Sequence, residues 1–160
     1  MPGQVVTLIL LAALMAPAAI APAVLAQDVT APATYGEAYL SAGFTPDPHR
    51  VPLTAGGDID AAASIGGGCI GHIARAPDFD LYYNAGTLPL IISVGSGADT
   101  TLAVNAPDGS WYCDDDGGDG LNPSVRFSPP QTGVYDIWVG TVLEAQPAPA
   151  VLTISELHSQ

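Results

Sequence analysis

The residues best suited to chemistry are a cluster of carboxylates in the second half of the chain. Four aspartates fall within six positions: Asp114, Asp115, Asp116 and Asp119. Two like charges ~4 Å apart repel by about 1 kcal/mol even in water, so such a cluster needs full solvation or a cation. Ca²⁺ suits it, since this ion takes ~6–8 oxygen ligands in flexible loops. The predicted ligands are drawn from Asp99, Asp114, Asp115, Asp116, Asp119 and Asn122.

The spacing of the cluster differs from that of an EF-hand loop. Gly118 stands where that loop needs a third acidic or amide ligand, and no flanking helices are evident. Asp99 joins the candidate set only through topology: the start of one antiparallel strand lies beside the end of the next. A calcium site and a solvated acidic loop therefore both stay open for this segment.

Cys69 and Cys113 are the only cysteines. In an oxidising compartment a single pair normally forms a disulfide, and neither cysteine has the CxxC spacing of a metal site. Closing a loop of 44 residues is worth roughly 3–4 kcal/mol in the loop-entropy description. The sequence predicts a structural disulfide.

No nucleophile with a positioned base is visible. The histidines are His49, His72 and His158, and Ser96 lies in a Gly-Ser-Gly segment without the outer glycine of a nucleophile elbow. A catalytic triad needs a histidine base beside an activated serine. We expect no enzyme activity and no catalytic residues.

Exposed aromatic rings offer a different kind of site. Most of the aromatic residues, including Tyr82, Tyr83, Trp111 and Tyr112, are expected to fill the core. Trp138 alternates with Ile137 and Val139 and so faces away from them. It is the candidate ligand-binding platform, which would suit a sugar ring.

The charge balance excludes several partners. The chain has 16 acidic and 3 basic residues, a net charge of −13 and no lysine. Nucleic acids and anionic membrane surfaces are bound through Lys and Arg, so neither is expected as a partner. An unknown protein or a glycan remains.

The elements that must position these residues begin after an apolar start. Residues 1–26 contain an apolar run from Val5 to Leu14, broken only by Thr7, and small residues before Gln27. They predict a signal peptide removed on export to the periplasm or the medium. Residues 27–50 read as an irregular lead-in rich in proline, in which Tyr35, Tyr39, Leu40 and Phe44 could form one short turn or strand. Residues 51–160 read as one domain.

That domain shows a period of two residues rather than the period of a helix. Apolar and polar residues alternate in segments such as 79–84, 101–105 and 134–139, and Pro107-Asp108-Gly109 predicts a hairpin turn. About eight short strands with frequent turns predict an all-β, antiparallel sandwich or barrel.

The chain resembles the bacterial pre-peptidase C-terminal domain in four segments: the run from Asp99 to Val104, the turn at 107–109, the cluster at 114–116 and the segment 133–139. The similarity extends over about residues 59–155. The resemblance implies a calcium-associated jelly-roll sandwich that acts as an accessory or binding module. We therefore expect an exported, non-enzymatic, calcium-stabilised module. A peptidase-related hydrolase and a carbohydrate-binding module that uses exposed aromatic residues are the alternatives.

Overall fold

The computed structural model describes residues 27–160, and the predicted signal peptide, residues 1–26, lies outside the described residues. The regular secondary structure of the described part is nearly all strand, as expected, with one short helix. Its elements are β1 (Glu37–Ser41), β2 (His49–Ala55), β3 (Ile59–Asp60), α1 (Ala61–Ser64), β4 (His72–Ile73), β5 (Phe79–Asn84), β6 (Leu90–Ser96), β7 (Thr100–Asn105), β8 (Trp111–Asp114), β9 (Ser124–Phe127), β10 (Gly133–Thr141) and β11 (Ala148–Ser155).

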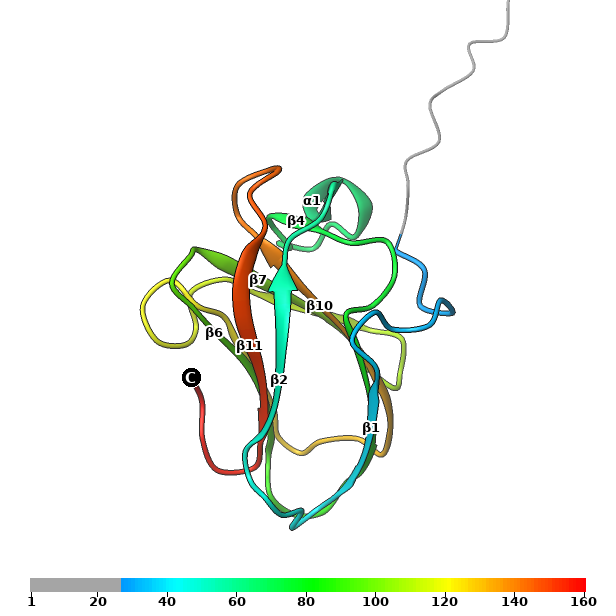
Figure 1. Ribbon diagram of the computed structural model, residues 1–160. Helices are drawn as coiled ribbons and strands as arrows, with labels where there is room; N and C mark the ends of the chain where they lie inside the picture. The colour runs from blue at the N-terminus through cyan, green and yellow to red at the C-terminus, as the bar shows by residue number, and fades with distance from the viewer. Residues whose placement is uncertain (1–26) are drawn as a thin grey trace, which may run out of the picture.

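The strands form two sheets that face each other, so the predicted sandwich is confirmed (Figure 1). In the larger sheet β1, β5, β10, β7 and β8 lie side by side, and the short strands β4 and β3 extend it beside the end of β10. The smaller sheet has the order β2-β11-β6-β9. All strand pairs are antiparallel except β1 with β5, which run parallel.

The main core lies between the two sheets and follows from the alternation of residues. In β5, Phe79, Leu81 and Tyr83 are buried, whereas the residues between them point to the outer face. β10, β7 and the smaller sheet supply most of the rest of this core, including Tyr135, Ile137, Val139, Leu102, Val104, Ile92, Val94, Leu152 and Ile154.

A second, smaller core covers part of the outer face of the larger sheet. The segment from β3 to β4 folds back over this face with α1, whose N-terminus is capped by the Asp60 carboxylate at 2.8 Å from the Ala62 amide. Its apolar residues are Ala61, Cys69, Ile73, Ala103 and Trp138, with Ile65, Trp111 and Cys113 packed against them.

Residues 27–50 are not an irregular lead-in. Residues 37–41 form β1, and β2 begins at His49, so the sandwich starts before residue 51. Ala38 and Leu40 pack against the main core, while Tyr39 faces outward. Residues 37–41 thus form the strand that the sequence allowed as one possibility.

Buried polar groups fasten this segment to the C-terminal end of β11. The Glu156 carboxylate accepts hydrogen bonds from the Tyr83 hydroxyl and from the Gly43 amide, both at 2.7 Å. Asp47 accepts from the Glu156 amide at 3.0 Å. Burying a carboxylate is costly unless it is hydrogen-bonded, and here each carboxylate has partners. The N-terminal segment is thus an integral part of the fold.

The predicted hairpin at Pro107-Asp108-Gly109 joins β7 to β8. The Gly109 amide donates to the Ala106 carbonyl at 2.8 Å, and Gly109 has a φ of 78°, which a side chain would strain. The Ser110 amide donates to the Asp108 carboxylate at 2.9 Å. Pro107-Asp108-Gly109 therefore forms the hairpin turn that the sequence predicts.

Candidate binding surface

The acidic loop after β8 is organised by its own carboxylate and amide groups. Asp114 Oδ2 accepts hydrogen bonds from the Gly117 amide at 2.7 Å and from the Ser124 amide at 2.8 Å. These bonds close the loop at both ends, so Asp114 has a structural task in the described arrangement.

Asn122 joins this loop to the start of β7. Its Oδ1 accepts from the Ser96 amide at 3.1 Å and from the Thr100 hydroxyl at 3.0 Å, while its Nδ2 donates to the Asp119 carbonyl. The start of β7, next to Asp99, therefore lies beside the end of the loop, as the antiparallel topology predicted.

The six predicted calcium ligands are close in the fold but do not converge on one point. Asp114 and Asn122 already direct side-chain oxygens at protein groups. Within residues 27–160, no three His, Cys, Asp or Glu side chains are grouped so that they could hold a metal ion. The described arrangement does not fit Ca²⁺, which needs several oxygens around one centre. Calcium binding stays a prediction, and it requires a rearrangement of the loop side chains.

The prediction for Trp138 is wrong. Its side chain does face away from Ile137 and Val139, but it is fully buried. The smaller core covers the outer face at this point, and the Trp138 ring lies 5.0 Å from that of Trp111. A buried ring offers no surface to a sugar.

The disulfide prediction is confirmed. Cys69 and Cys113 are joined by a disulfide, which attaches the segment between β3 and β4 to β8. Cys69 is buried beside Trp138 in the smaller core. The disulfide is therefore part of what covers this half of the outer face.

The groups that a hydrolase would need are apart from one another. The Ser96 hydroxyl donates to the Pro149 carbonyl at 2.9 Å, and the His49 ring packs against Phe79. His72 Nδ1 is buried and has no hydrogen-bond partner. This geometry does not favour the hydrolase alternative.

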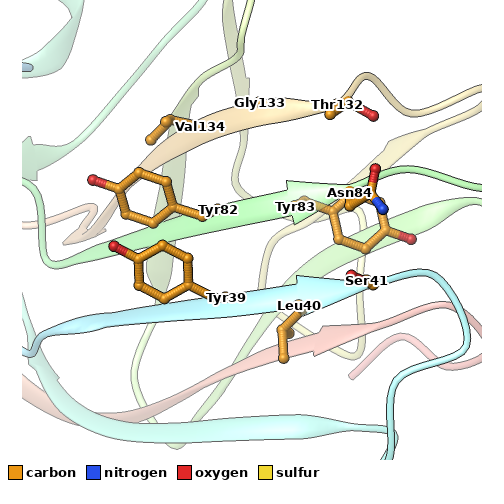
Figure 2. Close-up of a pocket in the computed structure, with 9 residues that line it drawn as sticks. All are labelled: Tyr39, Leu40, Ser41, Tyr82, Tyr83, Asn84, Thr132, Gly133 and Val134. Carbon is orange, nitrogen blue, oxygen red and sulfur yellow. The ribbon is translucent and has the colours of Figure 1, made fainter.

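The other half of the outer face of the larger sheet is open. There, Tyr39 of β1 and Tyr82 of β5 stack with their ring centroids 4.5 Å apart and their planes 9° from parallel. Val134 of β10 lies opposite Tyr82 in the register (Figure 2). The Tyr39 side chain is 70% exposed. We call Tyr39 and Tyr82 the tyrosine pair.

A pocket of about 300 Å³ adjoins the tyrosine pair (Figure 2). It lies where β1 and β5 end and β10 begins, and its lining is mostly apolar, with the polar side chains of Ser41, Asn84 and Thr132 at its rim. A shallow apolar hollow beside exposed aromatic rings is typical of a surface that receives part of another molecule.

A row of three carboxylates crosses the same face next to the tyrosine pair. In the register, Glu37 of β1 lies opposite Asp80 of β5, and Asp80 lies opposite Asp136 of β10. The Tyr39 hydroxyl donates to the Glu37 carboxylate at 3.2 Å. We call Glu37, Asp80 and Asp136 the acidic row.

Two carboxyl groups of the acidic row have raised pKa values. Burial, together with the neighbouring Asp80 carboxylate, raises the pKa of Asp136 to about 6. Burial and the Glu37 carboxylate also raise the pKa of Asp80, against a hydrogen bond with Asp136 that lowers it. Asp80 and Asp136 thus form a carboxyl pair that tends to keep a proton, because two like charges side by side cannot both ionise easily.

The family comparison covers β5 and β10 of this face but not β1. Residues 78–141, from the residue before β5 to the end of β10, match the family model of the bacterial pre-peptidase C-terminal domain. The resemblance seen in the sequence is confirmed. That family is a non-catalytic domain, which agrees with the expectation that the chain is not an enzyme.

Two further comparisons complete the picture. No curated protein matches the chain. Among solved structures, one similar fold is that of PliG from Aeromonas hydrophila, a periplasmic inhibitor of g-type lysozyme. It is 13% identical, with 74% of this chain and 96% of that chain covered and a TM-score of 0.40. Within residues 27–160, no helix is long and apolar enough to cross a membrane.

Sequence reasoning missed the open face because its residues come from separate strands. The period of two shows that Asp80 and Tyr82 share a face, and the same holds for Val134 and Asp136. Nothing in the sequence shows that β1 pairs in parallel with β5, which is what brings Tyr39 onto Tyr82.

Proposed function

We propose that this protein is an exported, non-catalytic β-sandwich domain that binds a protein partner through the open half of the outer face of its larger sheet. The observation that carries the proposal is the exposed tyrosine pair beside a pocket. Tyrosine is enriched at protein interfaces, since its ring supplies contact area and its hydroxyl a hydrogen bond.

Export is supported by two independent features. The sequence of residues 1–26 predicts a signal peptide, and the Cys69–Cys113 disulfide is typical of an oxidising compartment. The periplasm and the medium are both compatible with them.

A protein is favoured over a glycan by the way the rings are stacked. A sugar ring packs on a free aromatic face. Tyr82 is covered by Tyr39 on one side and flanked by Val134 on the other, so only the outer face of Tyr39 is free. One free face next to three carboxylates is a poor sugar platform and a good site for a mixed apolar and polar protein surface.

Site-specific photocrosslinking in the exporting cell tests the proposal. A photoreactive phenylalanine analogue placed at Tyr39 should form a discrete adduct with another protein. Tyr112 is the matched control position, because it is a 39% exposed tyrosine on β8, at the opposite edge of the same sheet. Adducts of equal yield from both positions, or none from position 39, would contradict the proposal.

If the partner is a glycan, a different result is expected. In that case position 39 gives no protein adduct, and a glycan array shows binding that Tyr39→Ala abolishes while Tyr112→Ala does not.

A further inference from the structure

The acidic row has no positive charge to balance it. The chain has three arginines. Arg75 lies 3.7 Å from Asp28, while Arg50 and Arg126 belong to β2 and β9 of the smaller sheet. Within residues 27–160, none of the three forms an ion pair with the row.

The neighbours of the row also leave it unpaired. Beyond Asp136 the register continues to Asn105 of β7 and then to Trp111 of β8, neither of which carries charge. On its own strands the row is flanked by Tyr39, Tyr82 and Val134 on one side and by the buried Trp138 on the other. Asp80 Oδ1 is buried and accepts no hydrogen bond.

The tyrosine pair adds to the preference for a cation. Aromatic rings attract Lys and Arg side chains through their faces, and the free face of Tyr39 is next to Glu37. A guanidinium group is planar, can stack on that ring and can donate to carboxylates at the same time.

From this charge complementarity we propose that the acidic row and the tyrosine pair together form a docking surface for an arginine-rich or lysine-rich segment of the partner protein. This rests on the proposed function and specifies the chemistry of its partner. The cations of that segment would neutralise the charges of the three carboxylates, which no cation of the chain pairs with within residues 27–160.

The docking surface predicts that binding depends on pH. A bound cation favours the ionised carboxylates, so proton and partner compete for the same groups. The pKa of Asp136 is about 6, with Asp80 as the charged group that faces it, and Glu37 in turn faces Asp80. Affinity should accordingly fall as the pH is lowered from 7.5 to 5.

A titration of the purified exported protein with a hexa-arginine peptide tests the inference, read out by backbone amide NMR shifts and calorimetry. The titration is run near physiological ionic strength, where the Debye length is about 8 Å, so that distant charges contribute little. The largest shifts should fall on β1, β5 and the first half of β10.

Two variants with the same loss of negative charge distinguish binding at the acidic row from non-specific attraction of the peptide to an acidic protein. The row variant is Glu37→Gln, Asp80→Asn and Asp136→Asn. The control variant is Asp115→Asn, Asp116→Asn and Asp119→Asn in the acidic loop. Three surface ion pairs of usual strength together amount to about tenfold in affinity. We expect the row variant to lose about tenfold and the control variant less than about twofold.

Equal losses in the two variants, or a wild-type protein that does not bind the peptide, would overturn the inference. The row variant should melt no lower than the wild type at pH 7.5, because it removes like-charge repulsion. If it does not fold, the single exchange Glu37→Gln at the exposed edge, compared with Asp116→Asn, makes the same test. A protein adduct at position 39 without a response to hexa-arginine would leave the proposed function intact and reject the cationic partner.

Discussion

At the scale of single residues, the carboxyl groups of the larger sheet differ in how they are held. Asp78, just before β5, is 3% exposed, and its Oδ2 accepts from the Val139 amide at 2.7 Å. Burial raises the pKa of Asp78 to about 7, against that hydrogen bond, which lowers it. This carboxyl is a structural bridge between β5 and β10, whereas the acidic row faces outward.

Asp78 provides a test of this bridge. Asp78→Asn keeps an acceptor for the Val139 amide, so its free energy of unfolding should stay close to that of the wild type. Asp78→Ala leaves that amide buried and unpaired and should cost ~1–3 kcal/mol. Chemical denaturation of both variants at pH 4, well below the folded pKa of about 7, measures the difference. Equal destabilisation would show that the hydrogen bond is not what holds the strands here.

The same residue predicts how stability varies with pH. Its folded pKa of about 7 lies above the ordinary carboxyl pKa of 3.8, so the native state binds more protons than the unfolded state between these values. Stability from this group is therefore present at low pH and is lost as the pH rises through that window. Asp78→Asn should flatten the fall in melting temperature between pH 5 and pH 8. An unchanged slope would assign that fall to other carboxyl groups.

At the scale of elements, the disulfide is the bond that keeps the covering segment on the outer face. It joins Cys69 beside α1 to Cys113 on β8. Native disulfides of this kind contribute about 2–4 kcal/mol. Cys69→Ala should lower the free energy of unfolding by that amount and expose Trp138, which is seen as a red shift in its fluorescence. Two free thiols in the denatured, unreduced wild type would contradict the assignment.

The loop after β8 is the element in which sequence and structure differ most. Calcium binding predicts that the melting temperature rises with millimolar CaCl₂ more than with NaCl of equal ionic strength, and that Asp116→Ala removes this extra rise. Mg²⁺ should do less. Equal effects of the two salts would leave the loop as a solvated turn closed by Asp114, which is the arrangement described.

At the scale of the whole molecule, the sequence predicts what depends on local pattern. Alternation placed Phe79, Leu81 and Tyr83 in the core, and the Pro-Asp-Gly turn predicted the hairpin. Trp138 shows the limit of this reasoning. Alternation tells which face a side chain takes, but only the fold shows that residues 59–73 cover that face.

Long-range pairing is the other part that local pattern could not predict. The parallel contact between β1 and β5 joins residues more than forty positions apart, and it creates both the tyrosine pair and the first link of the acidic row. In each strand these residues look like ordinary solvent-facing positions. The register between the strands decides which of these side chains are neighbours on the sheet.

Export is a prediction at this scale as well. If residues 1–26 are a signal peptide, mass spectrometry of the protein recovered from the producing cells should place its N-terminus near Gln27. The mature chain then contains every element described. A soluble protein that still begins at Met1 would contradict export by this route.

The central claim is that the open half of the larger sheet is where this protein binds its partner. The most direct measurement is the affinity for the protein that crosslinks to position 39. It is compared between a double variant, Tyr39→Ala combined with Tyr82→Ala, and the control Tyr112→Ala. Interface tyrosines that matter contribute ~2 kcal/mol or more, so the double variant should lose well over tenfold in affinity while the control keeps it. An unchanged affinity in the double variant, or an equal loss in Tyr112→Ala, would contradict the account.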